Sequence, residues 1–156
     1  MGRWEHGVGK DPTDFVLDHL CIGDFFIFRH PEHTCVYEEI AKCIKLGKDD
    51  PAKLSRQEER YRSAGLPSQM PVGECMVILR HHHSPAVRLL MNDWWMELEL
   101  NSRRDQVSLP FAAWRQKRSL RFFRDGRMAG SGASGIFDRQ RHSISTSHPS
   151  IGAASA

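Results

Sequence analysis

Residues 84–114 constrain the fold more than any other part of the chain, because two apolar segments there flank a short polar one. Ser84 followed by Pro85 is typical of a helix start, where backbone N–H groups are free and a residue without one is tolerated. Helical spacing then places five apolar side chains on one face: Val87, Leu90, Met91, Trp94 and Leu98. We therefore predict an amphipathic helix packed against a core, with a rigidly held polar segment at its end.

The polar segment, residues 102–106, reads Ser-Arg-Arg-Asp-Gln and is where we expect any chemistry to lie. Residue types alone also allow a purely structural interpretation. Asp105 can cap the following helix, and Arg103 or Arg104 can form solvated surface ion pairs. At this point both interpretations stand.

Length and composition indicate one soluble globular domain. The chain has 156 residues, of which 40% are hydrophobic and 26% charged, enough to bury a single core. Residues 126–156 are rich in Gly, Ser and Ala, so burial there cannot offset the entropy of ordering the chain. We predict a domain over residues 1–125 and a flexible tail over residues 126–156.

Charge and hydropathy argue against a nucleic-acid partner and against a membrane span. The net charge is +3, and Lys and Arg are mixed with acids except over residues 115–127. No run approaches the roughly 20 apolar residues of a membrane helix, and residues 1–14 lack the apolar core of a signal peptide. The cysteines form no CxxC pair and no zinc-ligand spacing, which favours free thiols in a reducing compartment. We expect a cytoplasmic protein.

Two buried strands and five helices are predicted along the chain. Residues 24–28, DFFIF, form a continuous apolar run between Gly23 and Pro31, and residues 74–80, ECMVILR, form a second one. We expect these strands to be neighbours in an α/β fold. The helices are expected near residues 11–20, 34–46, 50–64, 85–100 and 106–117. Because so small a sheet leaves edges uncovered, we also expect marginal stability or association through those edges.

Two clusters suggest a metal ion but have simpler explanations. The pair Asp49 and Asp50 precedes a proline at a helix start, so capping accounts for Asp50. Residues 81–83 are three histidines, but neighbouring side chains on an extended chain point in opposite directions. A single helper histidine is therefore favoured over a metal site there.

Several ordered motifs together resemble a known family. They are FRHP at 28–31, CVYEE at 35–39, QEERYR at 57–62, GLP at 65–67, VILR at 77–80, WW at 94–95 and RDQVS at 104–108. Over roughly residues 24–114 the chain resembles the plant and bacterial glycosyltransferase-like domain family whose plant members are named for turgor-defect and mucilage phenotypes. The resemblance implies a nucleotide-sugar transferase with a carbohydrate or lipid acceptor. It also implies a partial Rossmann-like sheet of the glycosyltransferase A type, flanked by helices.

The resemblance also implies a divalent cofactor. In such enzymes an Asp-X-Asp motif holds manganese against the donor diphosphate, which gains negative charge as it leaves. No Asp-X-Asp occurs in the 156 residues, so we predict no metal ligand in this chain. In the family that motif lies upstream of the segment matching residues 14–28. We therefore expect either the C-terminal portion of a longer transferase or a shortened, non-catalytic sugar- or nucleotide-binding remnant.

Roles for four residues follow from the resemblance. Asp105 resembles the acidic residue at a helix start that faces the acceptor hydroxyl or the donor sugar, and Gln106 would bind sugar hydroxyls beside it. Arg104 and Arg29 would face the diphosphate, since a guanidinium pairs with two phosphate oxygens at once.

His30 and Trp95 complete the set of candidate site residues. His30 follows the first strand, and ligands bind at strand ends in open α/β sheets. Trp95 offers a face for sugar stacking, although aromatic residues at helical spacing more often pack in a core. If the site is real, Arg29 and His30 should meet residues 104–106 on one concave surface.

Overall fold

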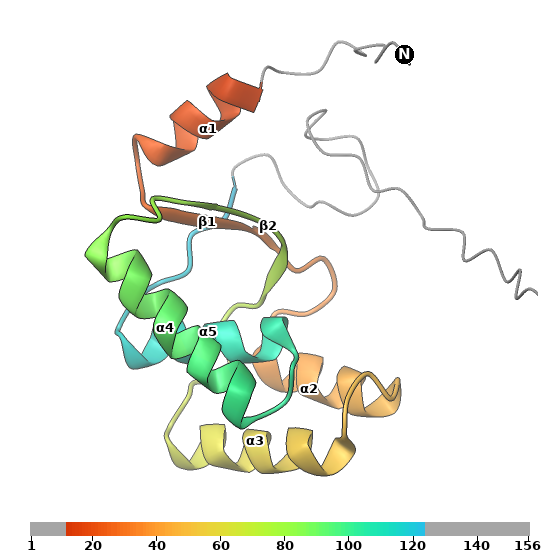
Figure 1. Cartoon of the computed structure of the whole chain (residues 1–156). Helices are drawn as coiled ribbons and strands as arrows, with labels where there is room; N and C mark the ends of the chain where they lie inside the picture. Colours follow the sequence, from red (N-terminus) through yellow and green to blue (C-terminus); the bar gives the residue numbers. More distant parts are fainter. Residues whose placement is uncertain (1–11, 124–156) are drawn as a thin grey trace, which may run out of the picture.

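The computed structural model describes residues 12–123 as a mixed α/β fold (Figure 1). Its elements are α1 (Pro12–Leu20), β1 (Phe25–Arg29), α2 (Val36–Lys45), α3 (Pro51–Ser63), β2 (Gly73–Arg80), α4 (Pro85–Leu100) and α5 (Asp105–Arg115). The two predicted strands and five predicted helices are confirmed to within a few residues at their ends. The predicted burial is confirmed for β1 but wrong for β2, the outer strand of the pair, in which only Gly73 and Glu74 are buried. The predicted tail, residues 126–156, lies outside the described residues.

β1 and β2 are neighbours, as predicted, and they run antiparallel. Phe25 lies opposite Arg80 and Arg29 opposite Gly73, with a register shift after Ile27. A parallel strand order needs a crossover helix packed on the sheet. Here the two helices of the connection, α2 and α3, pack against each other and α5 instead (Figure 1). Within residues 12–123 the sheet therefore has two antiparallel strands, and it does not show the parallel order of a Rossmann-like sheet.

One edge of this sheet is partly closed. The backbone of Ile27 accepts a hydrogen bond from Phe123 N (3.0 Å) and donates one to Arg121 O (3.2 Å). The segment after α5 thus runs beside β1 as a short extra pairing. We expected both edges of the sheet to be uncovered, and the edge at β1 is protected in this way. Association through the other edge, at β2, stays a prediction.

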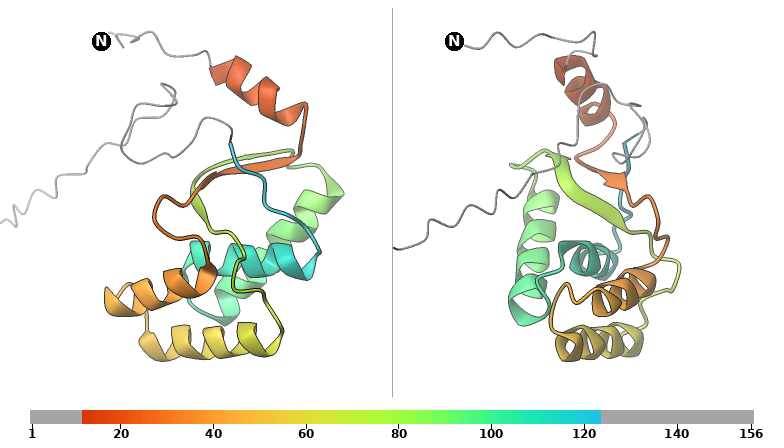
Figure 2. Two further views of the ribbon diagram at one scale, coloured as in Figure 1. Left: turned by 180° about the vertical axis from the view of Figure 1, so that it is seen from behind. Right: turned by 90° about the vertical axis from the view of Figure 1, so that its right-hand side faces the viewer.

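Side chains from both faces of β1 are buried, which explains its unbroken apolar sequence. Phe25 and Ile27 pack against α4 and α5, whereas Phe26 and Phe28 pack with Phe15 of α1. Figure 2 shows the sheet between α1 on one side and α4 with α5 on the other, and α2 with α3 below α5. A further core joins α2, α3 and α5. α5 is therefore the central element, in contact with both large cores.

Among the described residues, the helix ends at Asp50 and Gly47 follow the sequence signals, whereas the start of α4 does not. Asp50 Oδ1 accepts the N–H of Ala52 (2.9 Å), which confirms the cap. Gly47 closes α2 with φ at +60°, a conformation that other residues rarely adopt. Ser84, predicted as the cap of α4, makes no capping bond. Its hydroxyl instead donates to Asp24 Oδ2 (3.4 Å), so it ties the start of α4 to the start of β1.

The predicted apolar face of α4 is confirmed at its centre, where Val87, Leu90 and Trp94 are buried. Trp94 Nε1 donates to Ser108 Oγ (2.9 Å), which fixes α4 against α5. Glu97, on the same face, is also buried. None of the helices in residues 12–123 combines the length and apolar character needed to cross a membrane.

Candidate functional site

A cavity of about 410 Å³ lies where the end of β1, the start of β2 and the start of α5 meet. Its lining consists of His30, Pro31, Glu32, Lys48, Glu74, Cys75, Met76, Arg104, Asp105 and Gln106. The structure thus brings His30 together with the polar segment at residues 104–106, although more than 70 residues separate them in the sequence.

Two predicted site residues do not line this cavity. Arg29 is exposed, and its guanidinium carbon lies 4.2 Å from the centre of the Phe122 ring. Trp95 is 63% exposed on α4. The histidines at 81–83 line a different hollow, together with Leu20 and Arg80. The cavity therefore includes four of the five residues that we expected to converge.

A buried hydrogen-bond network holds the polar segment in place. The side-chain oxygen Oε1 of Gln57 in α3 accepts two hydrogen bonds from Ser102. One comes from Ser102 Oγ (2.6 Å) and the other from the Ser102 backbone N–H (3.3 Å). Gln57 Nε2 donates to the Tyr61 hydroxyl (2.7 Å), which donates to Glu97 Oε2 (3.0 Å). Burial raises the pKa of Tyr61, so its hydroxyl keeps the proton that it donates. Through Gln57, α3 thus anchors the start of this segment.

Asp49 adds a second anchor for the same segment. Its Oδ2 accepts the N–H of Arg103 (2.8 Å) and its Oδ1 accepts that of Asp50 (2.7 Å). These bonds lower the pKa of Asp49, the bond from Asp50 most of all. Asp49 and Asp50 thus both accept backbone hydrogen bonds, as residues that organise a helix start do.

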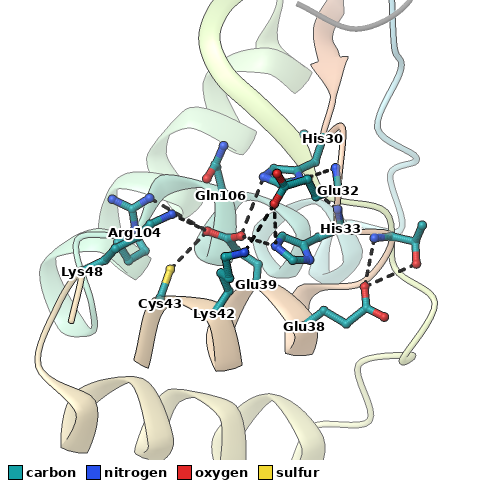
Figure 3. A network of polar contacts seen from close by, with 12 residues as sticks. His30, Glu32, His33, Glu38, Glu39, Lys42, Cys43, Lys48, Arg104 and Gln106 are labelled. Atoms are coloured by element: carbon teal, nitrogen blue, oxygen red, sulfur yellow. Dashed lines mark hydrogen bonds and ion pairs between the residues drawn. The ribbon is translucent and has the colours of Figure 1, made fainter. Parts of the chain in front are cut away.

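Glu39 of α2 is a fully buried carboxylate at the centre of a polar network (Figure 3). Its Oε1 accepts from Cys43 Sγ (3.1 Å) and lies 3.9 Å from both Lys48 Nζ and Arg104 Nη2. Its Oε2 lies 3.7 Å from His30 Nε2 and 3.6 Å from His33 Nε2. Oε2 has no hydrogen-bond partner within residues 12–123. A buried charge with contacts this long is costly, so the arrangement needs a functional or ligand-related explanation.

Sequence reasoning assigned no role to Glu39, although a signal was present. Val36, Ile40 and Cys43 are apolar, buried and at helical spacing around it, so Glu39 is a charged residue on an apolar helix face. Such a residue is rarely buried without a reason. Lys48 gave no comparable signal, because a lysine after a helix end is usually solvated.

The Cys43 thiol is a proton donor in this network. Burial, together with its hydrogen bond to Glu39, raises the pKa of Cys43 to about 11. Burial also raises the pKa of Cys75, which lines the cavity. All four cysteines are free, as expected, and these two remain protonated at neutral pH.

Hydrogen bonds from the backbone determine which nitrogen of His30 carries the proton. His30 Nδ1 accepts the N–H groups of Glu32 (3.2 Å) and His33 (2.9 Å). Burial lowers the pKa of His30, although Glu39 opposes this, so the ring is neutral at pH 7. In a neutral ring with Nδ1 as acceptor, Nε2 carries the hydrogen. His30 therefore presents an N–H donor to Glu39.

Arg104 and Asp105 lie at the start of α5 and face the cavity. Arg104 is the N-cap residue, and its Nε is buried without a hydrogen-bond partner within residues 12–123. Asp105 is the first helical residue, and its Oδ1 accepts the N–H of Gln106 (2.8 Å). Asp105 thus acts partly as a cap, and Oδ2 is the oxygen that can face a ligand.

The sequence match to a family now has a structural context. A family model described as TOD1/MUCI70, glycosyltransferase-like domain, matches residues 10–128. The chain belongs to this family. The match includes α1 to α5 and every residue that lines the cavity, and it extends beyond the expected residues 24–114 at both ends. Searches of curated proteins and of solved structures gave no significant match.

The resemblance to A-type transferases implies a manganese ion. In this TOD1/MUCI70 domain, one group of side chains can be tested as its ligands. Within residues 12–123, His30, His33 and Glu39 form the one group of three possible ligands whose atoms lie within 4.8 Å of one another. A metal-binding imidazole nitrogen needs a free electron pair, but His30 Nε2 carries hydrogen. His33 Nε2 and Glu39 Oε2 then remain as the two available ligand atoms of this group. The group therefore does not supply three protein ligands to a metal ion.

Proposed function

We propose that this protein transfers a sugar from a nucleotide-sugar donor to a carbohydrate or lipid acceptor, and that the reaction occurs in the cavity at the start of α5. Membership of a glycosyltransferase-like family supports a role of this kind. The observation that carries the assignment to this cavity is that His30, Arg104, Asp105 and Gln106 line it together. Cationic, acidic and amide groups in one hollow suit a ligand with both phosphates and hydroxyls.

In the proposed step, the Asp105 carboxylate accepts the proton of the acceptor hydroxyl. The acceptor oxygen bonds to the anomeric carbon, and the bond from that carbon to the donor diphosphate breaks. The electron pair leaves with the nucleoside diphosphate, whose growing negative charge Arg104 offsets. Gln106 hydrogen-bonds to sugar hydroxyls.

The fold that belongs to this proposal is the Rossmann-like sheet of A-type glycosyltransferases. In it, β1 and β2 would form an antiparallel pair at the edge of a mainly parallel sheet, an arrangement that is common in large mixed sheets. The cavity at the end of β1 would then lie at the strand ends where such sheets bind ligands.

A second function, binding without catalysis, is favoured by one contact. Asp105 Oδ1 accepts a hydrogen bond from the backbone of its own helix, as a purely structural cap does. In that case the cavity would hold a sugar or nucleotide but transfer nothing.

The test is a transfer assay with a panel of nucleotide-sugar donors and with oligosaccharide and glycolipid acceptors. Mass spectrometry detects the elongated acceptor, and released nucleoside diphosphate is measured in parallel. We expect transfer by the unaltered protein and none by Asp105→Asn, with donor binding retained. Donor binding by both proteins without any product would support the binding function. Equal transfer by both proteins would remove Asp105 from the catalytic role.

A further inference from the structure

We propose that this cavity binds a diphosphate group without a divalent metal ion, with Arg104 and Lys48 supplying the neutralising charge. The inference rests on the proposed function, because it specifies how the donor's diphosphate is recognised. It assigns to two side chains the role that manganese has in transferases with an Asp-X-Asp motif. Lys48 becomes a site residue, which the sequence did not indicate.

The positions of the two cations carry the proposal. Lys48 follows the end of α2 and Arg104 precedes α5, yet both line the cavity. Lys48 Nζ and Arg104 Nη2 each lie 3.9 Å from the same oxygen, Glu39 Oε1, so the two nitrogens lie within 7.8 Å of each other. Oxygens on two linked phosphorus atoms can bridge such a gap. The buried Glu39 charge is the group that draws both cations to one place.

Both cations keep donor capacity for a ligand. A separation of 3.9 Å is too long for a hydrogen bond, so Glu39 Oε1 does not satisfy either of them. Arg104 Nε is buried without a partner within residues 12–123, and an unpaired buried donor is costly unless a ligand oxygen accepts its hydrogen. His30 Nε2–H adds a neutral donor beside them. Guanidinium and ammonium groups with open donors are typical of phosphate recognition.

Among the described residues, the acids that line the cavity form no group of three metal ligands. Glu32, Glu74 and Asp105 line it, but within residues 12–123 they belong to no group of three ligand atoms close enough to share an ion. The group His30, His33 and Glu39 is close enough, but His30 cannot serve as a ligand in it. The backbone N–H groups of Glu32 and His33 bond to His30 Nδ1, so its Nε2 carries the hydrogen. In this proposal the neutralising charge comes from the side-chain cations Lys48 and Arg104. The acids suit sugar hydroxyls better than phosphate oxygens.

The experiment measures diphosphate binding with and without a metal ion. The full chain is titrated by calorimetry with uridine diphosphate, guanosine diphosphate and inorganic pyrophosphate, first in EDTA and then with manganese chloride. We expect at least one of these probes to bind in EDTA, with an affinity that manganese leaves unchanged and that falls as sodium chloride is raised.

Substitutions identify the cations. Arg104→Gln and Lys48→Gln should each weaken binding about tenfold, since each removes a charged hydrogen-bond donor. The matched controls, Arg103→Gln and Lys45→Gln, remove exposed cations that do not line the cavity and should leave binding unchanged. Lys48→Arg keeps the charge and should keep most of the affinity. Circular dichroism checks that each variant is folded.

The other possible results contradict either the metal-free diphosphate site or the proposed sugar transfer. Binding that requires manganese, binding insensitive to both substitutions, or no binding under any condition overturns the metal-free site. If sugar transfer occurs but diphosphates bind only with manganese, the proposed function stands and this inference fails. If diphosphates bind in EDTA but no donor is used, the inference stands and the catalytic proposal fails.

Discussion

Gln57 and Ser102, 45 positions apart in the sequence, are joined by two hydrogen bonds to a single amide oxygen. Both residues are fully buried, so this contact determines where the chain leaves α4 and enters α5. We therefore expect the orientation of Arg104 and Asp105 toward the cavity to depend on Gln57 of α3. Gln57 acts on them through Ser102.

Replacing Gln57 tests this dependence. Gln57→Leu keeps the size of the side chain but leaves the Ser102 hydroxyl and the Tyr61 hydroxyl short of a partner. We expect a loss of about 1–3 kcal/mol in the free energy of unfolding, measured by urea denaturation. Diphosphate binding should weaken as well. Gln69→Leu, at an exposed loop position, serves as the control and should change neither quantity.

The charge of Glu39 should be visible in the titration of His30. Burial lowers the pKa of His30, and the nearby Glu39 charge partly raises it again. Glu39→Gln removes that charge at constant shape, so the pKa of His30 should fall further. Proton NMR of the imidazole signals across pH 4 to 8 measures it. Glu38→Gln, the exposed neighbour, should not move it, and an unchanged pKa in Glu39→Gln would mean that the two groups do not interact.

Stability should fall as the pH drops below 6.5. Because the pKa of His30 is lower in the folded protein than its ordinary 6.5, the unfolded chain binds more protons between the two values. This contribution is complete above pH 6.5 and is lost as pH falls toward the folded pKa, with a slope of at most about 1.4 kcal/mol per pH unit.

Urea denaturation at several pH values measures this slope. His30→Asn keeps an acceptor for the N–H groups of Glu32 and His33 but cannot titrate in this range, so part of the slope should disappear. His82→Asn, at an exposed position outside the Glu39 network, is the matched control. The same slope in His30→Asn as in the unaltered protein would show that another group is responsible.

The two adjacent tryptophans should respond differently to the same substitution. Trp94→Phe removes a buried indole N–H that donates to Ser108 and leaves a gap between α4 and α5. We expect a destabilisation of about 1–3 kcal/mol. Trp95→Phe, at a position 63% exposed, should change stability by less than about 0.5 kcal/mol. Thermal unfolding compares them, and equal effects would contradict the assignment of Trp94 alone to the core.

The sequence by itself determined the local structure and the family. Asp50 before a proline, Gly47 after an apolar helix and the unbroken run at residues 25–28 each depend on interactions within a few positions, so their consequences could be predicted and were confirmed. The ordered motifs were sufficient for the family, because they are a property of the chain and not of its packing.

Only the tertiary structure decided which polar groups meet. Arg29 and His30 are adjacent in the sequence, yet one stacks on Phe122 and the other lines the cavity. Lys48 joins Arg104 at Glu39 because α2 packs against α5, which no local pattern specifies. Capping and periodicity involve near neighbours, whereas the site depends on how helices far apart in the sequence pack together. That packing is set by the whole core, so the cations around Glu39 could not be found from the sequence alone.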